Sequence, residues 1–196
     1  MDSILCTSRS GSENLLNYLS NVIGRKKENS PFSKDKRITF DVLKEDNFYK
    51  FIISDTSVDL SDMFQFGEKI IEKSNIFILL DRKDLNKQAE SYAFKKYKYG
   101  NDVSKYHIKE KYEKMEKDVI DNAKKELKEQ KKVIRKLSKK YNKKIYYYED
   151  IFYGNGIDEL SKELKVNINT NFKNLFLSNF NKERVINTKE SLIWLK

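Results

Sequence analysis

Residues 3–23 have the sequence SILCTSRSGSENLLNYLSNVI, which contains three kinds of segment in turn. The apolar run Ser3–Thr7 predicts a short buried strand, and the polar run Ser8–Ser12, with a glycine inside it, predicts a turn. Apolar residues then recur at helical spacing at Leu15, Leu16, Leu19, Val22 and Ile23. The chain is therefore expected to begin with a strand, a Ser/Gly loop and a helix.

The rest of the chain continues this alternation. Strands are predicted at residues 48–54, 75–80 and 144–148, helices at 62–73, 84–99 and 157–164, and a loop at 24–37. The continuous apolar run Ile76–Leu80 suits a parallel strand that is covered on both faces. Alternating strands and helices predict an α/β protein with a mainly parallel central sheet flanked by helices, and the length of 196 residues predicts a single domain over 1–196.

The formal net charge of +10 is concentrated in one segment. Residues Lys105–Lys144 hold 16 Lys and Arg against 7 Asp and Glu, which gives this segment a net charge of +9. Apolar residues at helical spacing predict a long basic helical segment over 104–141, which either projects from the core or breaks near Gln130. The segment has three interpretations: a nucleic-acid-binding surface, a solvated face, or a helix that pairs with a second copy to form a homo-oligomer.

Rare residue types and short apolar runs exclude several classes of protein. Cys6 is the only cysteine and His107 the only histidine, so an intramolecular disulfide and Cys-rich or poly-His metal sites are excluded. The longest apolar run, Ile76–Leu80, is far below the ~20 residues that span a bilayer, and the first 20 residues lack a secretory signal pattern. We therefore expect a cytoplasmic protein without a membrane span.

Three polar sequences follow predicted strands, where ligands bind in parallel sheets. Thr7–Asn14 follows the first strand, Asp81–Tyr92 follows the strand at 75–80, and Tyr147–Ile151 closes the strand at 144–148. In the first, backbone N–H groups at a helix start, serine hydroxyls and the Arg9 guanidinium together suit an anion, although an ordinary serine helix cap has the same composition. The pattern Gly-x-x-x-x-Gly-Lys-Ser/Thr is absent, which disfavours a nucleotide kinase.

Taken together, the three sequences resemble the sulfotransferases that use 3′-phosphoadenosine-5′-phosphosulfate (PAPS), in particular the bacterial branch that includes trehalose sulfotransferase. Arg9-Ser10-Gly11-Ser12 is similar to the family's 5′-phosphosulfate loop, Pro-Arg-Ser-Gly-Ser-Thr, with Ser8 in place of Pro and Glu13 in place of Thr. Arg82 to Ser91 is similar to its 3′-phosphate element, and Tyr148-Glu149-Asp150-Ile151 to its Tyr-Glu-Asp-Leu. The resemblance covers residues 3–152 as scattered motifs.

The resemblance implies a P-loop-like three-layer fold, in which these residues would bind different parts of the nucleotide. The 5′-phosphosulfate would lie on the first loop, and the 3′-phosphate on the second element. The implied cofactor-binding residues are Arg9, Ser10, Gly11, Ser12, Glu13, Asn14, Arg82, Lys83 and Ser91. A hydroxyl of a carbohydrate or small metabolite would be the acceptor, and Glu28 or His107 would remove its proton.

Two other interpretations stay open at this stage. The C-terminal segment 165–196 is expected to be a tail that packs on the core. A short sulfotransferase-like chain with Glu13 at its sulfate loop could bind the nucleotide without transferring sulfate. Alternatively, the chain could be an α/β protein that binds nucleic acid through the segment Lys105–Lys144.

Overall fold

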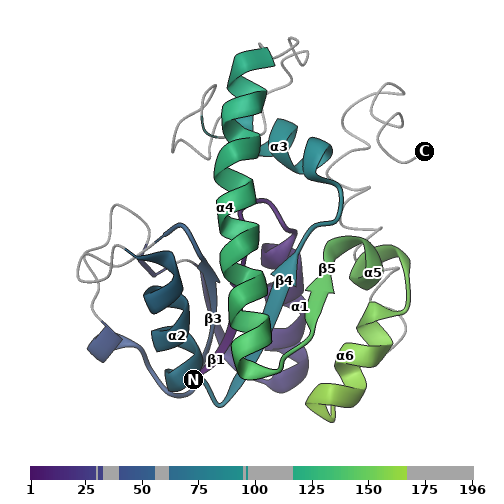
Figure 1. Ribbon diagram of the computed structural model, residues 1–196. Helices are drawn as coiled ribbons and strands as arrows, with labels where there is room; N and C mark the ends of the chain where they lie inside the picture. The colour runs from purple at the N-terminus through teal and green to yellow at the C-terminus, as the bar shows by residue number, and fades with distance from the viewer. Residues whose placement is uncertain (30, 33–39, 56–61, 95, 97–116, 167–196) are drawn as a thin grey trace.

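The structure is a computed structural model that describes residues 1–29, 31–32, 40–55, 62–94, 96 and 117–166. Five parallel strands form one sheet in the order β2-β3-β1-β4-β5, with helices on both faces (Figure 1). The predicted α/β class and central parallel sheet are therefore confirmed. The strands are β1 (Asp2–Cys6), β2 (Lys26–Asn29), β3 (Asn47–Ile52), β4 (Ile76–Asp81) and β5 (Ile145–Tyr147). The helices are α1 (Ser12–Ile23), α2 (Met63–Lys73), α3 (Leu85–Ala93), α4 (Lys117–Tyr141), α5 (Tyr148–Tyr153) and α6 (Gly156–Leu164), with a 3₁₀ turn at Phe40–Val42.

Alternating side chains of the strands build a separate core on each face of the sheet. Ile4 and Cys6 of β1 pack in the cluster that contains the apolar faces of α1, α5 and α6. Leu5, between them in the sequence, packs in the cluster of α2 and α4. Successive side chains of a strand point to opposite faces, so a strand covered on both sides must be apolar throughout. This arrangement explains the unbroken apolar run in β4.

The chain leaves β1 and β3 toward opposite faces of the sheet. The connection after β1 leads to α1 on one face, whereas the connection after β3 leads to α2 on the other. In open parallel sheets, ligands bind at the carboxyl ends of strands where neighbouring connections diverge in this way. The topology therefore directs attention to the loop between β1 and α1.

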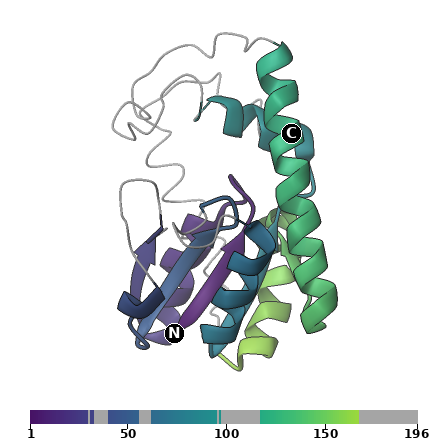
Figure 2. The same cartoon turned by 60° about the vertical axis from the view of Figure 1, so that its left-hand side comes forward.

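The long helix α4 runs along one face of the sheet, and its amino-terminal part extends beyond the carboxyl edge (Figures 1 and 2). Its lower part contributes Ile134 and Leu137 to the core below α2. Its upper part packs against α3 through a small cluster formed by Ala89, Ala93, Ala123 and Leu127. The helix is continuous through Gln130, so the predicted break at that residue is wrong.

Two elements differ from the sequence prediction. The predicted loop at 24–37 contains β2, a four-residue edge strand with the polar sequence KKEN, which lacks any apolar pattern because it is mostly exposed. The predicted strand at 144–148 ends at Tyr147, and Tyr148 begins α5, which has acidic residues in its first turn. The predicted helix continuing to Tyr99 and the segments 104–116 and 167–196 lie largely outside the described residues.

None of the helices in the described ranges is both long enough and apolar enough to cross a membrane.

Candidate functional site

The loop between β1 and α1 has an unusual backbone. Arg9 and Gly11 both have positive φ angles, of 60° and 76°, in the left-handed region that L-residues rarely adopt. A Cβ atom at position 11 would overlap the ring of Tyr148, so both the backbone and the packing require glycine there. The ring of Tyr148 therefore packs directly against the loop at Gly11.

The amino end of α1 lacks a side-chain cap within the described part of the chain. In contrast, Asp62 caps α2 and Asp84 caps α3 by accepting backbone N–H hydrogen bonds. The first turn of an α-helix has N–H groups without partners in the helix, and they carry a partial positive charge. The amino ends of α5 and α6 likewise lack a side-chain cap, so α1 is one of three described helices that keep such groups for another acceptor.

A buried hydroxyl in the same loop also lacks a partner. Ser10 is completely buried, and its Oγ makes no hydrogen bond to any described residue. The neighbouring Cys6 thiol donates to the carbonyl of Phe51 over 3.3 Å, and burial raises the pKa of this thiol. Cys6 therefore stays protonated and structural. The hydroxyls of Ser10 and Ser12 lie beside its sulfur, and Ser10 has no nitrogen or oxygen partner in the described residues.

Two of the segments that were predicted to bind the nucleotide are in direct contact. The Nε of Arg9 donates a hydrogen bond to the Oγ of Ser91, with 2.9 Å between the two atoms. Arg9 comes from the loop after β1, and Ser91 from the second turn of α3, the helix after β4. The structure thus brings together a pair that the sequence placed in separate motifs.

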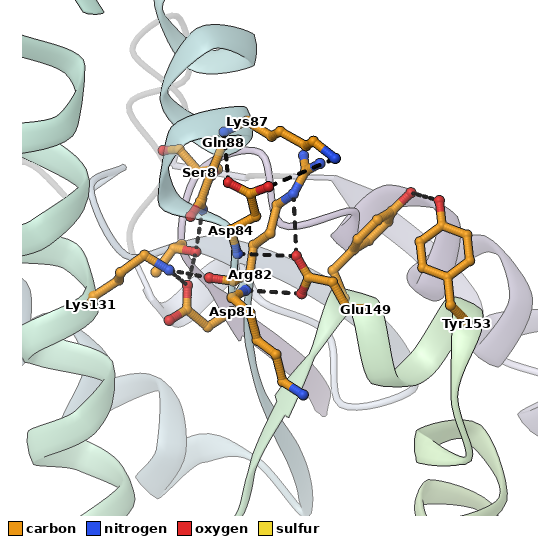
Figure 3. A network of polar contacts seen from close by, with 12 residues as sticks. Ser8, Asp81, Arg82, Asp84, Lys87, Gln88, Lys131, Glu149 and Tyr153 are labelled. Carbon is orange, nitrogen blue, oxygen red and sulfur yellow. Dashed lines mark hydrogen bonds and ion pairs between the residues drawn. The ribbon is translucent and has the colours of Figure 1, made fainter. Parts of the chain in front are cut away.

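The two candidate cations after β4 point to different partners. The Arg82 guanidinium lies 5.0 Å from the ring centroid of Tyr148, and its Nε is 3.7 Å from Oε1 of Glu149 (Figure 3). Lys83 instead forms an ion pair with Asp150 and lies over the ring of Tyr147. Because the ring of Tyr148 also covers Gly11, Arg82 is the cation that lies beside the loop, and Lys83 faces the β5 edge.

Glu149 has a structural role in this turn. Its carboxylate accepts the backbone N–H of Lys83 over 2.9 Å and that of Asp84 over 3.2 Å (Figure 3). Asp84 in turn caps α3, so Glu149 fixes the path of the chain from β4 into the helix that carries Ser91.

The remaining predicted residues are distributed as follows. Ser12 is buried in the first turn of α1, while Glu13 and Asn14 are exposed. Oε1 of Glu13 is 3.5 Å from Nδ2 of Asn29 at the β2 edge, so its carboxylate is directed to the side of the sheet opposite Tyr148. The residue that replaces the family's threonine therefore points away from Arg82.

The two candidate bases have different outcomes. Glu28 lies in β2 at the level of Tyr49 and Ser3 in the sheet, and it accepts a hydrogen bond of 3.0 Å from Asn47 at the amino end of β3. The loop begins four residues beyond Ser3, or about 13 Å along the strand at ~3.3 Å per residue. The structure therefore does not bring Glu28 to the loop. His107 lies outside the described residues.

Below the loop lies a buried polar network that the sequence did not predict. Asp81 accepts hydrogen bonds from Thr7 over 2.8 Å and from the Lys131 ammonium over 2.7 Å (Figure 3). Gln88 of α3 and Gln130 of α4 add further contacts to Thr7 and Ser8. One feature of the sequence could have indicated this network. The apolar pattern of the helical segment is interrupted once, because the polar residues Gln130 and Lys131 lie between Leu127 and Ile134.

A hollow of about 270 Å³ lies beside β5, away from the loop, and includes Lys144, Asp150 and Glu159. Lys144 and Glu159 neutralise each other there in an ion pair. It contains none of the unpartnered polar atoms found in the loop, so we place the candidate site at the loop after β1.

No protein-family model matches the chain, and no curated protein is significantly similar to it.

Proposed function

We propose that the chain binds a nucleotide with a 5′-phosphosulfate and a 3′-phosphate, and that it transfers a sulfuryl group from PAPS to a hydroxyl of a carbohydrate or small metabolite. The observation that carries the proposal is the hydrogen bond between Arg9 and Ser91. It joins the two elements to which the resemblance assigns the two ends of the nucleotide, at the carboxyl edge where a parallel sheet binds its ligands.

The residues of the loop fit the 5′ end of such a nucleotide. The N–H groups of the first turn of α1, the unpartnered Ser10 hydroxyl and the Arg9 guanidinium are all donors, which is what a phosphosulfate requires. Arg82 and Ser91 are the proposed ligands of the 3′-phosphate, with Arg82 preferred to Lys83 because Arg82 lies over the Tyr148 ring that also covers Gly11 of the loop. The nucleotide supplies the activated sulfuryl group, and the protein contributes positioning and charge stabilisation.

The proposal assigns no catalytic role to Glu28, because its carboxylate is held by Asn47 far from the loop. His107 remains the sequence-based candidate for the base that removes the acceptor proton. If the chain binds nucleotide but lacks an effective base, it is the catalytically inactive binding protein considered above.

Titration calorimetry with 3′,5′-adenosine bisphosphate tests the proposal. We expect binding in the micromolar range, weakened about tenfold by Ser91→Ala through the loss of a hydrogen bond to a charged group. Ser74→Ala is the matched control, since Ser74 makes a serine–serine hydrogen bond of 2.8 Å with Ser3 at the opposite end of the sheet. Absence of binding at millimolar nucleotide would overturn the proposal.

An assay of sulfate transfer separates the active from the inactive form of the proposal. Labelled PAPS is incubated with a panel of sugars, glycans and small hydroxyl metabolites, and product is detected by mass spectrometry. Transfer that is abolished by His107→Gln with nucleotide binding unchanged supports the enzyme. Nucleotide binding without transfer to any acceptor supports the inactive form.

A second candidate function, nucleic-acid binding, is favoured by the outer face of α4. Exposed cations recur every three or four residues along one face, so they form a row: Lys125, Lys128, Lys132, Arg135, Lys136 and Lys139. Lys132 pairs with Glu129, and the other five have no ion-pair partner in the described ranges. The row is about 21 Å long at 1.5 Å per residue, and it includes no apolar side chain that would insert into a membrane.

The salt dependence of duplex DNA binding tests this second candidate. Five phosphate contacts predict that affinity falls by roughly 500-fold between 50 and 200 mM salt. Lys128→Gln/Arg135→Gln should weaken binding, whereas Lys69→Gln/Lys73→Gln on α2, with the same change of charge, should not. Equal effects of the two double variants, or no binding at 50 mM salt, would reject it.

A further inference from the structure

Two glutamine side chains bond to the two peptide groups of a single loop residue, Ser8. The N–H of Ser8 donates to Oε1 of Gln130 on α4, with 2.8 Å between the atoms. The carbonyl of Ser8 accepts a hydrogen bond of 2.7 Å from Nε2 of Gln88 on α3. Gln88 is completely buried and Gln130 is 2% exposed, so neither contact is shared with bulk water. We call these two residues the glutamine clamp.

The hydrogen bonds of the clamp involve Thr7 as well as Ser8, and Oε1 of Gln88 makes none to a described residue. Nε2 of Gln88 donates to the carbonyl of Ser8 and, over 2.9 Å, to Oγ1 of Thr7 (Figure 3). Oγ1 of Thr7 uses its own hydrogen to donate to Asp81. Two acceptors therefore fix the orientation of the Gln88 amide, and Thr7 acts once as acceptor and once as donor. One side chain from α3 and one from α4 are thus hydrogen-bonded to the loop.

The clamp acts on the residue immediately before the left-handed Arg9. Arg9 carries a side chain at a φ angle of 60°, a conformation that persists only where the surroundings determine it. With both peptide groups of Ser8 fixed, the backbone enters Arg9 from one direction, and the guanidinium reaches Ser91. The N–H of Ser8 is also occupied by Gln130, so the N–H groups that can receive an anion lie after Ser8.

The same stretch of α4 also holds the second nucleotide element. Lys131, the neighbour of Gln130, pairs with Asp81 at the end of β4 and donates to the backbone carbonyl of Arg82 (Figure 3). One turn of α4 is therefore attached both to the loop that carries Arg9 and to the turn that carries Arg82. It sets the position of one relative to the other.

We propose that Gln88 and Gln130 are positioning residues, which hold the β1–α1 loop in its anion-binding shape before the ligand arrives. This inference rests on the proposed function for its ligand, but the clamp itself acts in the free protein. Preorganisation of this kind raises affinity because the loop need not be ordered on binding.

Hydrogen exchange measured by mass spectrometry on the ligand-free protein tests the clamp. Gln130→Met and Gln88→Met keep the length of the side chain and remove its hydrogen bonds. We expect exchange at residues 8–13 to be at least tenfold faster in each variant, with exchange in β3 unchanged. The control is Gln65→Met, a similar change at an exposed position of α2. Unchanged exchange at residues 8–13 in both variants overturns the proposal.

Affinity for 3′,5′-adenosine bisphosphate is the second readout. We expect each clamp variant to bind at least tenfold more weakly than the wild type, at a temperature where all variants are folded. Faster loop exchange with unchanged affinity also overturns the proposal, because the loop would then need no preorganisation. If the wild type does not bind the nucleotide, the proposed function fails, while the exchange experiment still decides whether the clamp holds the loop.

Discussion

Nε of Arg9 and Oγ of Ser91 are 2.9 Å apart, although 82 residues separate them in the chain. The contact joins the loop after the central strand to the helix after its neighbour β4. Parallel pairing of β1 with β4, in which Cys6 is opposite Leu80, brings the carboxyl ends of the two strands to one level. The contact is therefore a consequence of strand register, and it places a guanidinium and a hydroxyl at the edge where anionic ligands bind.

Because Arg9 has a left-handed backbone conformation, two substitutions of it should differ in stability but not in nucleotide affinity. Arg9→Gly and Arg9→Ala both remove the hydrogen bond to Ser91, but only glycine adopts a φ of 60° without strain. We expect the glycine variant to be about 1 kcal/mol more stable than the alanine variant in urea denaturation. Both variants should bind 3′,5′-adenosine bisphosphate at least tenfold more weakly. Equal stabilities of the two variants would contradict a strained Arg9.

Gly11 and Gly24 form a matched pair for testing the packing of Tyr148. Both have positive φ, of 76° and 72°, but a Cβ at Gly11 overlaps the Tyr148 ring, whereas no atom lies within 4 Å of a Cβ at Gly24. Gly24→Ala should therefore cost about 1 kcal/mol for the backbone alone. Gly11→Ala should cost a further ~1–3 kcal/mol because the ring must move. Thermal denaturation measures both, and equal costs would show that Tyr148 does not press on the loop.

The sequence predicted most of the central fold because the strands and helices there carry strong apolar patterns. β4, buried on both faces, is apolar from Ile76 to Leu80, and α1 and α2 repeat apolar residues at helical spacing. The edge strand β2 has no such pattern, since its KKEN sequence joins the sheet only through its pairing with β3. Edge pairing depends on backbone hydrogen bonds, which composition does not reveal.

The candidate site was predicted only in part. Arg9, Arg82 and Ser91 were candidates because they lie in short local motifs that resemble those of a known family, and such motifs are visible in a sequence. The interruption of the apolar pattern at Gln130 suggested that the helix breaks there. In the structure the helix continues, and the side chains of Gln130 and Lys131 form hydrogen bonds with Ser8 and Asp81. A single sequence does not tell a polar residue that disrupts a helix from one that has a buried partner.

The buried ion pair between Asp81 and Lys131 predicts that substitutions of these two residues have non-additive effects on the free energy of unfolding. Both side chains are nearly buried, at 3% and 9% exposure, and 2.7 Å separates Nζ from Oδ1. Lys131→Met leaves the carboxylate with only the Thr7 hydroxyl, and Asp81→Asn leaves a buried ammonium, so each change should cost about 3–5 kcal/mol. The double variant should cost clearly less than the sum, which a urea-denaturation cycle measures. Strictly additive costs would show that the two charges do not stabilise each other.

The lowered pKa of Glu163 predicts how the stability of the protein changes at acidic pH. Partial burial raises the pKa of its carboxyl, but hydrogen bonds from Tyr146 and Lys143 and the charge of Lys144 outweigh that effect and leave the pKa below its ordinary value. A carboxyl with a lowered pKa in the folded state stabilises the protein above its unfolded pKa of about 4.3. This stabilisation is lost as the pH falls through the folded pKa.

Glu163→Gln should therefore lower the free energy of unfolding at pH 7. Most of this difference between variant and wild type should disappear toward pH 3. Urea denaturation at several pH values measures the gap between variant and wild type, which should narrow as the pH falls. The control Glu72→Gln changes a carboxylate of α2 that forms no ion pair in the described ranges, so its gap should be small and nearly constant. A gap for Glu163→Gln that stays constant with pH would mean that the interaction with Tyr146 does not depend on the carboxylate charge.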